Sequence, residues 1–187
     1  MSTESEFERL RSRVEHLEDR AAILDCIAAH ARGCDRHDVA LLSSTYHDDG
    51  VDEHGKARIP GPEYAAWANG VHGAASQAHL HHITTHTCAI EGGSAHAESY
   101  VLVTLLSNDG KGATILCGRY VDRLERRDGS WKLAVRRATV ELAYHADASL
   151  LQSGFFKSQG YVRGTRDRSD PSYARPLSIE TTAERWG

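Results

Sequence analysis

Four stretches with the composition of β-strands follow one another in the second half of the chain. They span residues 81–92, 94–106, 113–127 and 130–144, and Gly-Gly, Asn-Asp-Gly and Asp-Gly lie between them. Connections this short join antiparallel neighbours, because a parallel pair needs a crossover of a dozen or more residues. The pattern therefore predicts an antiparallel meander of four long strands.

The first half of the chain shows helical periodicity instead. Apolar residues recur at spacings of three and four over residues 5–31, which predicts a helix that ends near Gly33. Shorter helices are expected over residues 38–46 and 63–77, the second starting after Pro62. Helices followed by a meander predict an α+β fold, in which the helices pack on one face of a curved antiparallel sheet.

The two ends of the chain differ from its centre. Residues 1–17 are thickly charged, and they are expected to project as a helical arm. Residues 146–187 are polar and rich in turn signals, and they are expected to form an extension that acts as a lid or contacts another subunit. One α+β domain remains, over residues 18–145, with a short strand in its turn-rich segment 47–62.

Charge and composition narrow the possible partners. The chain has 187 residues and a net charge of −4, which argues against a binder of nucleic acid or of anionic membranes. Apolar runs fall short of the roughly 20 residues of a membrane span. The charged N-terminus does not resemble a signal peptide, so the cytoplasm is the expected location. The four cysteines are scattered, which favours free thiols over a disulfide framework.

Motifs that hold common cofactors are absent from the sequence. No G-x-G-x-x-G follows a predicted strand, and there is no P-loop, G-x-S-x-G or H-E-x-x-H. Any chemistry is therefore expected to proceed without a cofactor, on side chains alone.

The densest group of reactive side chains is the run HLHHITTH at residues 79–86. Side chains alternate between the faces of a strand, so His82 and His86 are expected on one face and His81 on the other. Three interpretations are open: hydrogen-bonded histidines at a strand end, a metal site, or a general base oriented by a carboxylate. A candidate carboxylate is Asp35, which by itself is typical of a loop or a helix N-cap.

Three segments of the chain together resemble a known family. They are EDRAAILDCIAAHARGCDRHD from Glu18, the pattern H-x-x-T-H before AIEGG, and YVDRLERRDGSWKLAVRR from Tyr120. They are similar to the SnoaL-like, scytalone-dehydratase-like branch of the nuclear transport factor 2-like superfamily, which includes hexachlorocyclohexane dehydrochlorinase and bile-acid 7α-dehydratase. The resemblance implies a cone-shaped sheet wrapped around N-terminal helices, with a deep pocket inside.

The resemblance also implies roles for single residues. Asp35 and His82 match the aspartate–histidine dyad with which lyases of this branch abstract a proton. His30 stands where relatives carry a polar residue that assists the leaving group, and Arg136 matches an arginine that can polarise a substrate oxygen. Further residues expected at the substrate are Tyr46, Trp67 and His86.

These matches predict a cofactor-independent lyase of dehydratase type without a metal, acting on a small hydrophobic, cyclic substrate. An isomerase, a polyketide-type cyclase or a monooxygenase-like enzyme on the same fold stays open, because the fold does not fix the reaction. A non-catalytic module, similar to the β subunits of ring-hydroxylating dioxygenases, is a further alternative. A homo-oligomer is expected, with a trimer favoured over a dimer.

Overall fold

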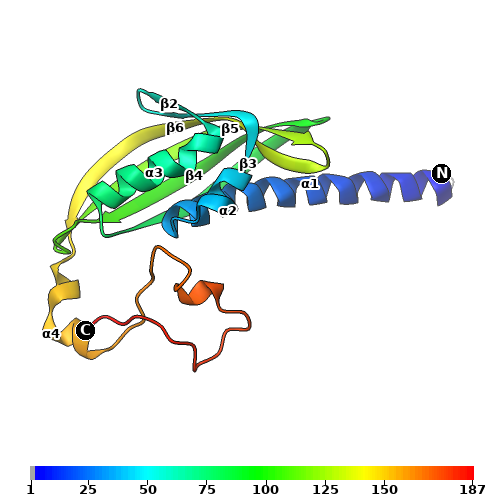
Figure 1. The fold of residues 1–187 in the computed structure, drawn as a ribbon. Coiled ribbons are helices and arrows are strands. Elements are labelled where there is room, and N and C mark those ends of the chain that lie inside the picture. Colours follow the sequence, from blue (N-terminus) through cyan, green and yellow to red (C-terminus); the bar gives the residue numbers. More distant parts are fainter. Residues whose placement is uncertain (1–2) are drawn as a thin grey trace.

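Six strands form one curved, unclosed sheet in the computed structural model, which describes residues 3–187 (Figure 1). The strands lie side by side in the order β2-β1-β6-β5-β4-β3. Their bounds are β1 (Tyr46–His54), β2 (Ala57–Pro60), β3 (Ala78–Glu91), β4 (Ser94–Leu106), β5 (Gly112–Arg127) and β6 (Ser130–Asp147).

The predicted α+β class and the meander of β3 to β6 are confirmed, with strand ends that differ from the expected ones by three residues at most. Asp128 and Gly129 both have positive φ angles, as the tight turn between β5 and β6 requires. The turn-rich segment holds two strands rather than one. One of them, β1, pairs with β6 in parallel, a pairing that the local turn signals do not indicate.

Three helices precede or interrupt the sheet: α1 (Thr3–Asp35), α2 (Val39–Ser44) and α3 (Gly61–Ala75). The expectation that α1 ends near Gly33 is wrong, because the helix continues to Asp35. Gly33 serves a packing role instead, since a Cβ atom there would collide with the backbone of Leu42 on α2. The N-cap of α2 is Asp38, whose carboxylate accepts a hydrogen bond from the Leu41 N–H.

The hydrophobic core lies between these helices and the concave face of the sheet. Its fully buried members include Ile23 and Ile27 of α1, Leu42 of α2, and Leu124 and Leu133 of the sheet. Full burial of each such side chain contributes about 1.5–3 kcal/mol. The core therefore fixes the end of α1 against the sheet, while the first half of α1 projects beyond the sheet as an arm (Figure 1).

A bulge in β3 decides which of its histidines face inward. The pairing register with β4 shifts between Ile83 and His86. Up to Ile83 the odd-numbered side chains are the more buried ones, and from His86 onward the even-numbered ones are. The extra residue of the bulge lies at Thr84 and Thr85. Side chains therefore do not alternate strictly between the two faces of the sheet along the whole of β3.

A second irregularity lies where β5 and β6 approach each other closely. Their register shifts between Cys117 and Gly118. A side chain at Gly118 would overlap the carbonyl oxygen of Thr139, so this close approach requires glycine.

The C-terminal extension is ordered and packs beside the end of α1. It contains a short 3-10 helix (Ser149–Gln152), α4 (Gly154–Ser158) and a second 3-10 turn (Pro171–Tyr173). Figure 1 shows it leaving the end of β6 and running back beneath α1 and α3. Within residues 3–187 none of the helices combines the length and apolar character that crossing a membrane requires.

A histidine-lined cavity as the candidate active site

A cavity of about 380 Å³ lies between α3 and the concave face of the sheet. Apolar side chains of β4, β5, β6 and α3 form most of its wall, among them Val101, Val103, Leu105, Leu116, Trp67 and Val71. Three histidines reach the same space, namely His54, His72 and His81. An apolar wall with a few convergent polar groups is typical of a site for a small organic molecule.

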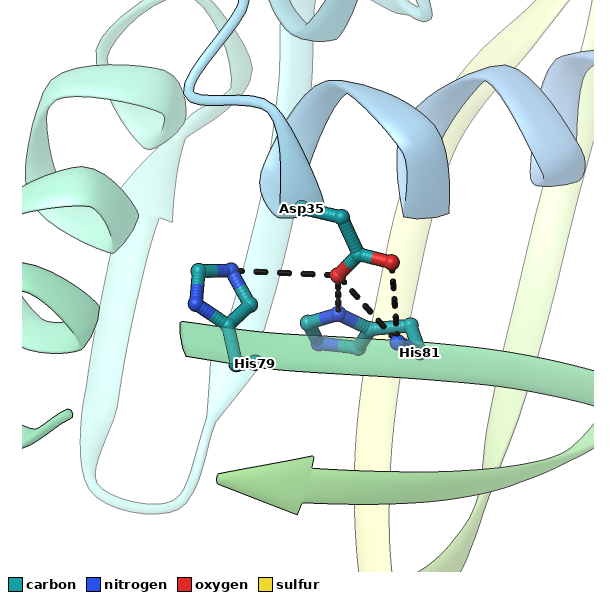
Figure 2. Close-up of side chains that lie close together, drawn as sticks. All are labelled: Asp35, His79 and His81. Atoms are coloured by element: carbon teal, nitrogen blue, oxygen red, sulfur yellow. Dashed lines mark hydrogen bonds and ion pairs between the residues drawn. The ribbon is translucent and has the colours of Figure 1, made fainter. Parts of the chain in front are cut away.

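His81 is held in this wall by Asp35, the last residue of α1. The ring Nδ1 of His81 lies 2.7 Å from Oδ1 of Asp35 (Figure 2). The backbone N–H of His81 also donates to both carboxylate oxygens, at 3.1 and 3.0 Å. The side chain of His81 is only 4% exposed and that of Asp35 11%. One carboxylate therefore fixes both the backbone and the ring of His81.

These contacts set the proton positions of the ring. A carboxylate only accepts hydrogen bonds, so Nδ1 of His81 carries a hydrogen and donates it to Asp35. Nε2 then has no hydrogen-bond partner among the described residues and belongs to a ring that lines the cavity. A neutral imidazole in this tautomer can take up a proton at Nε2, and the carboxylate stabilises the imidazolium that results.

The expected partner of Asp35 was His82, and this prediction is wrong. His82 is exposed on the opposite face of β3, where it pairs with Leu102 of β4. The physical reason is the bulge at Thr84 and Thr85, which places His81 and His86 on the same side of the sheet although their positions differ by an odd number. The motif spacing that matches His82 to the family's histidine does not take this bulge into account.

Comparison with known proteins identifies the family of the chain. Residues 15–137 match the SnoaL-like domain family. The chain belongs to this family. No curated protein matches it.

Several solved structures share the fold. LinA is 26% identical, with a TM-score of 0.66, over 71% of this chain and 92% of its own. A type 2 hexachlorocyclohexane dehydrochlorinase is 24% identical, with a TM-score of 0.67, over 72% and 93%. A candidate scytalone dehydratase from Novosphingobium aromaticivorans is 21% identical, with a TM-score of 0.63, over 71% and 92%. The family and these neighbours include enzymes that convert small molecules.

In this SnoaL-like domain, His79 extends the dyad into a cluster. Ligand atoms of Asp35, His79 and His81 lie within 4.8 Å of one another, close enough to consider a metal (Figure 2). Both nitrogens of His79 are already engaged, however. Nδ1 lies 2.7 Å from Nη2 of Arg166, which can only donate, and Nε2 lies 3.0 Å from the Cys34 carbonyl oxygen. The ring therefore bridges the C-terminal extension to α1, which disfavours His79 as a metal ligand.

His72 and His79, whose rings pack against His81, are uncharged at neutral pH. Burial, together with the neighbouring His72, His81 and Arg166, lowers the pKa of His79 to about 2. Burial, together with electrostatic repulsion from His81 and His37, lowers the pKa of His72 to about 3. A neutral His72 in the wall can accept or donate a hydrogen bond to a ligand, but it does not add positive charge to the cavity.

Two of the residues expected at the substrate lie behind the cavity wall. His30 is fully buried, and its Nε2 lies 2.9 Å from the hydroxyl of Tyr46. That hydroxyl in turn donates to Oδ2 of Asp52 at 2.6 Å. Burial lowers the pKa of His30 well below its usual value. His30 and Tyr46 do not belong to the lining of this cavity, where the ring of Tyr64 lies in front of them, and their contact with substrate stays a prediction.

Arg136 is also buried behind the cavity wall. Its guanidinium is fully buried and makes two parallel hydrogen bonds to Asp122, at 2.8 and 2.7 Å. It also lies 4.0 Å from the ring centre of Tyr120, whose other side faces the cavity region. Arg136 does not belong to the cavity lining, because it pairs with Asp122 on the neighbouring strand, and its contact with a substrate oxygen stays a prediction.

Trp67 lines the cavity as expected, whereas His86 does not belong to its lining. Nδ1 of His86 lies 2.9 Å from the Ser99 hydroxyl, farther along β3. Tyr64 and Tyr120 also line the cavity, although the sequence did not lead us to expect them there. Tyr64, Trp67 and Val71 have the helical spacing i, i+3 and i+7, a signal that could have identified this face of α3.

The C-terminal extension lies behind the dyad. Arg36, the residue after α1, donates to the Thr165 carbonyl and pairs with Asp170 at 3.2 Å, while Arg166 donates to the Ser76 carbonyl at 2.6 Å. The residues that line the cavity all precede residue 141. In this arrangement the extension supports the back of the site, and its action as a lid or subunit contact stays a prediction.

Proposed function

We propose that this SnoaL-like domain is a cofactor-independent lyase that uses His81, oriented by Asp35, as a general base. The observation that carries this proposal is the Asp35–His81 hydrogen bond at the wall of an open apolar cavity. An oriented imidazole within reach of a bound molecule is the arrangement that general-base catalysis requires. A purely structural module has no need for both features together.

The reaction that fits is an elimination of the dehydratase type. Nε2 of His81 takes a proton from a carbon next to an acidifying group such as a carbonyl. The electron pair left on that carbon forms a double bond to its neighbour, which releases water or another leaving group. Asp35 stabilises the imidazolium, and the low polarity of the wall strengthens this interaction.

The substrate class follows from the cavity. Its volume and its valine, leucine and tryptophan side chains fit a small hydrophobic molecule, and rings of Tyr64, Trp67 and Tyr120 offer flat faces for a cyclic one. The dehydrochlorinase neighbour supports an elimination, and the candidate scytalone dehydratase supports loss of water. An isomerase would use the same base but return the proton to the substrate, so the product distinguishes the two.

Two adjacent histidines on opposite faces of β3 allow a matched test. Elimination of 5-nitrobenzisoxazole requires only a base in an apolar pocket, and the phenolate product is coloured. We expect H81Q to lose the catalysed rate by a factor of about 100 or more, since general bases contribute about 10²–10⁴-fold. H82Q, which changes an exposed ring, should keep the wild-type rate.

The outcome is decisive in both directions. Equal rates in H81Q and wild type, with H81Q folded by circular dichroism, would rule out His81 as the base. A loss in H82Q and not in H81Q would restore the pairing that the sequence alone suggested. Product analysis with a β-hydroxy ketone then separates a lyase from an isomerase, because only the lyase forms an enone and water.

A cytoplasmic homo-oligomer, with a trimer favoured, is part of the same proposal. Phe7, Leu10, Val14 and Leu17 form an exposed apolar stripe on the projecting half of α1. A stripe of this kind is suited to pack against another subunit. Light scattering of the full chain and of a variant with Leu10 and Leu17 changed to Glu tests whether the arm holds the assembly together.

A further inference from the structure

A second histidine–aspartate pair faces the same cavity. His54, at the end of β1, lines the cavity, and its Nδ1 lies 2.7 Å from Oδ1 of Asp52. Asp52 is fully buried, while the His54 side chain is 32% exposed. As for His81, Nδ1 carries a hydrogen and donates it to the carboxylate, which leaves Nε2 for a molecule in the cavity. The cavity thus holds two histidines that each donate from Nδ1 to an aspartate of their own.

The proton positions behind Asp52 follow from its contacts. The Tyr46 hydroxyl donates to Oδ2, and the same hydroxyl accepts a hydrogen bond from Nε2 of His30. Both oxygens of Asp52 therefore accept, as those of a carboxylate do. Among residues 3–187, Asp52 makes no ion pair with a lysine or arginine, and Arg136, its register neighbour on β6, already forms an ion pair with Asp122. A proton on His54 is therefore the positive charge in direct contact that can offset Asp52.

Asp35 is placed differently. It accepts two hydrogen bonds from the backbone of His81 and lies in the attractive field of the Arg166 guanidinium. Its charge is therefore offset without a proton on His81. The two pairs are therefore suited to opposite tasks. The charge of Asp52 favours a protonated His54 that can donate a proton, whereas Asp35 leaves a neutral His81 that can accept a proton.

The positions of the two rings leave room for a substrate between them. β1 and β3 are separated in the sheet by β6, β5 and β4, so His54 and His81 approach from opposite sides. The ring centre of His54 lies 5.8 Å from that of Trp67, and the ring centre of His81 lies 5.5 Å from that of His72. Trp67 and His72 are five residues apart on α3, about 7.5 Å along its axis.

We propose that His54, positioned by Asp52, is a second catalytic residue that protonates an oxygen leaving group, so that the substrates are β-hydroxy carbonyl compounds. This inference rests on the proposed elimination at His81. A halide leaves as an anion without a proton, whereas hydroxide leaves readily only when it is protonated to water. A built-in proton donor across the cavity therefore favours a hydroxyl as leaving group.

The step balances as follows. The Cα–H bond breaks and its proton passes to Nε2 of His81, while its electron pair forms the Cα=Cβ double bond. The Cβ–O bond breaks and its electron pair stays on oxygen. His54 enters the step as an imidazolium, with hydrogens on both ring nitrogens, and its Nε2 proton completes a water molecule. His81 ends protonated and His54 neutral, and exchange with solvent restores both.

The test compares two leaving groups on one ketone, 3-hydroxy-1-phenylpropan-1-one and 3-chloro-1-phenylpropan-1-one, which both give phenyl vinyl ketone. H81Q should lose both reactions, because both need the base. H54Q should lose the hydroxy reaction by a factor of about 100 or more and the chloro reaction by much less. D52N should shift the ratio of the two rates in the same direction as H54Q, since it removes the carboxylate that positions the ring.

Each other result overturns the inference. Equal losses for both ketones in H54Q would make His54 a general structural residue and would leave the base at His81 standing. No loss in H54Q would remove His54 from the reaction. If wild-type protein eliminates neither ketone but converts 5-nitrobenzisoxazole through His81, the β-hydroxy carbonyl class is wrong although the base is real. Circular dichroism of each variant establishes that it is folded, and H54N repeats the test with a smaller side chain.

Discussion

Replacing Asp35 with asparagine is the sharpest perturbation of the proposed base. The two side chains have nearly the same shape, so packing at the end of α1 is preserved. Asparagine keeps one acceptor oxygen but presents an NH2 group where the second oxygen receives the His81 N–H at 3.0 Å. If the amide flips so that its NH2 group faces the ring instead, Nδ1 of His81 must accept, and the ring hydrogen moves to Nε2. The base is then blocked by its own hydrogen.

The size of the effect depends mainly on one hydrogen bond. In D35N the imidazolium that forms during proton transfer no longer donates to a carboxylate, and such an ionic hydrogen bond is worth about 1.5–3 kcal/mol. At 1.36 kcal/mol for each factor of ten, this corresponds to about a 10- to 150-fold slower reaction. The change of tautomer slows the reaction further. We therefore expect D35N to eliminate 5-nitrobenzisoxazole between about 100-fold and about 10,000-fold more slowly than wild type.

Two measurements accompany the rate. Nitrogen NMR of the histidines reports whether the His81 hydrogen lies on Nδ1 or Nε2, and urea unfolding reports whether the fold survives. H82Q is the matched control for any change near β3. The reasoning would be refuted if D35N kept the wild-type rate, or if the rate fell only in proportion to the fraction of unfolded protein.

Three further outcomes concern the support of the site. Because burial lowers the pKa of His72 and His79 to about 3 and about 2, the unfolded state binds more protons below about pH 6.5. The free energy of unfolding should fall from there toward pH 3, by up to about 1.4 kcal/mol per pH unit for each ring, and H72Q should flatten this slope in urea titrations. D122N leaves the buried guanidinium of Arg136 unpaired and should cost about 3–5 kcal/mol in urea unfolding, and an unchanged midpoint would contradict this. R166Q removes the hydrogen bonds to Ser76 and His79, so limited proteolysis should cut the extension faster, while equal cleavage would show that other contacts hold it.

The sequence predicted the fold well because its signals are local. Short turns between long strands can only join antiparallel neighbours, and the three-and-four spacing of apolar residues identifies the helices within a few residues. It also singled out Asp35, the carboxylate that pairs with His81 at the candidate site. Where the prediction depended on pairing between distant segments, it failed: the parallel contact of β1 with β6 leaves no mark in the local pattern.

The sequence by itself determined the α+β class, the meander and the family. Tertiary structure decided which histidine meets Asp35, because one extra residue at Thr84 and Thr85 reverses the faces of β3 and exchanges His82 for His81. It also placed His30 and Arg136 behind the wall and brought His54 of β1, four strands away from β3, to the same cavity as His81. Strand register and sheet curvature are set by packing across the whole domain, and residue spacing along the chain does not record them.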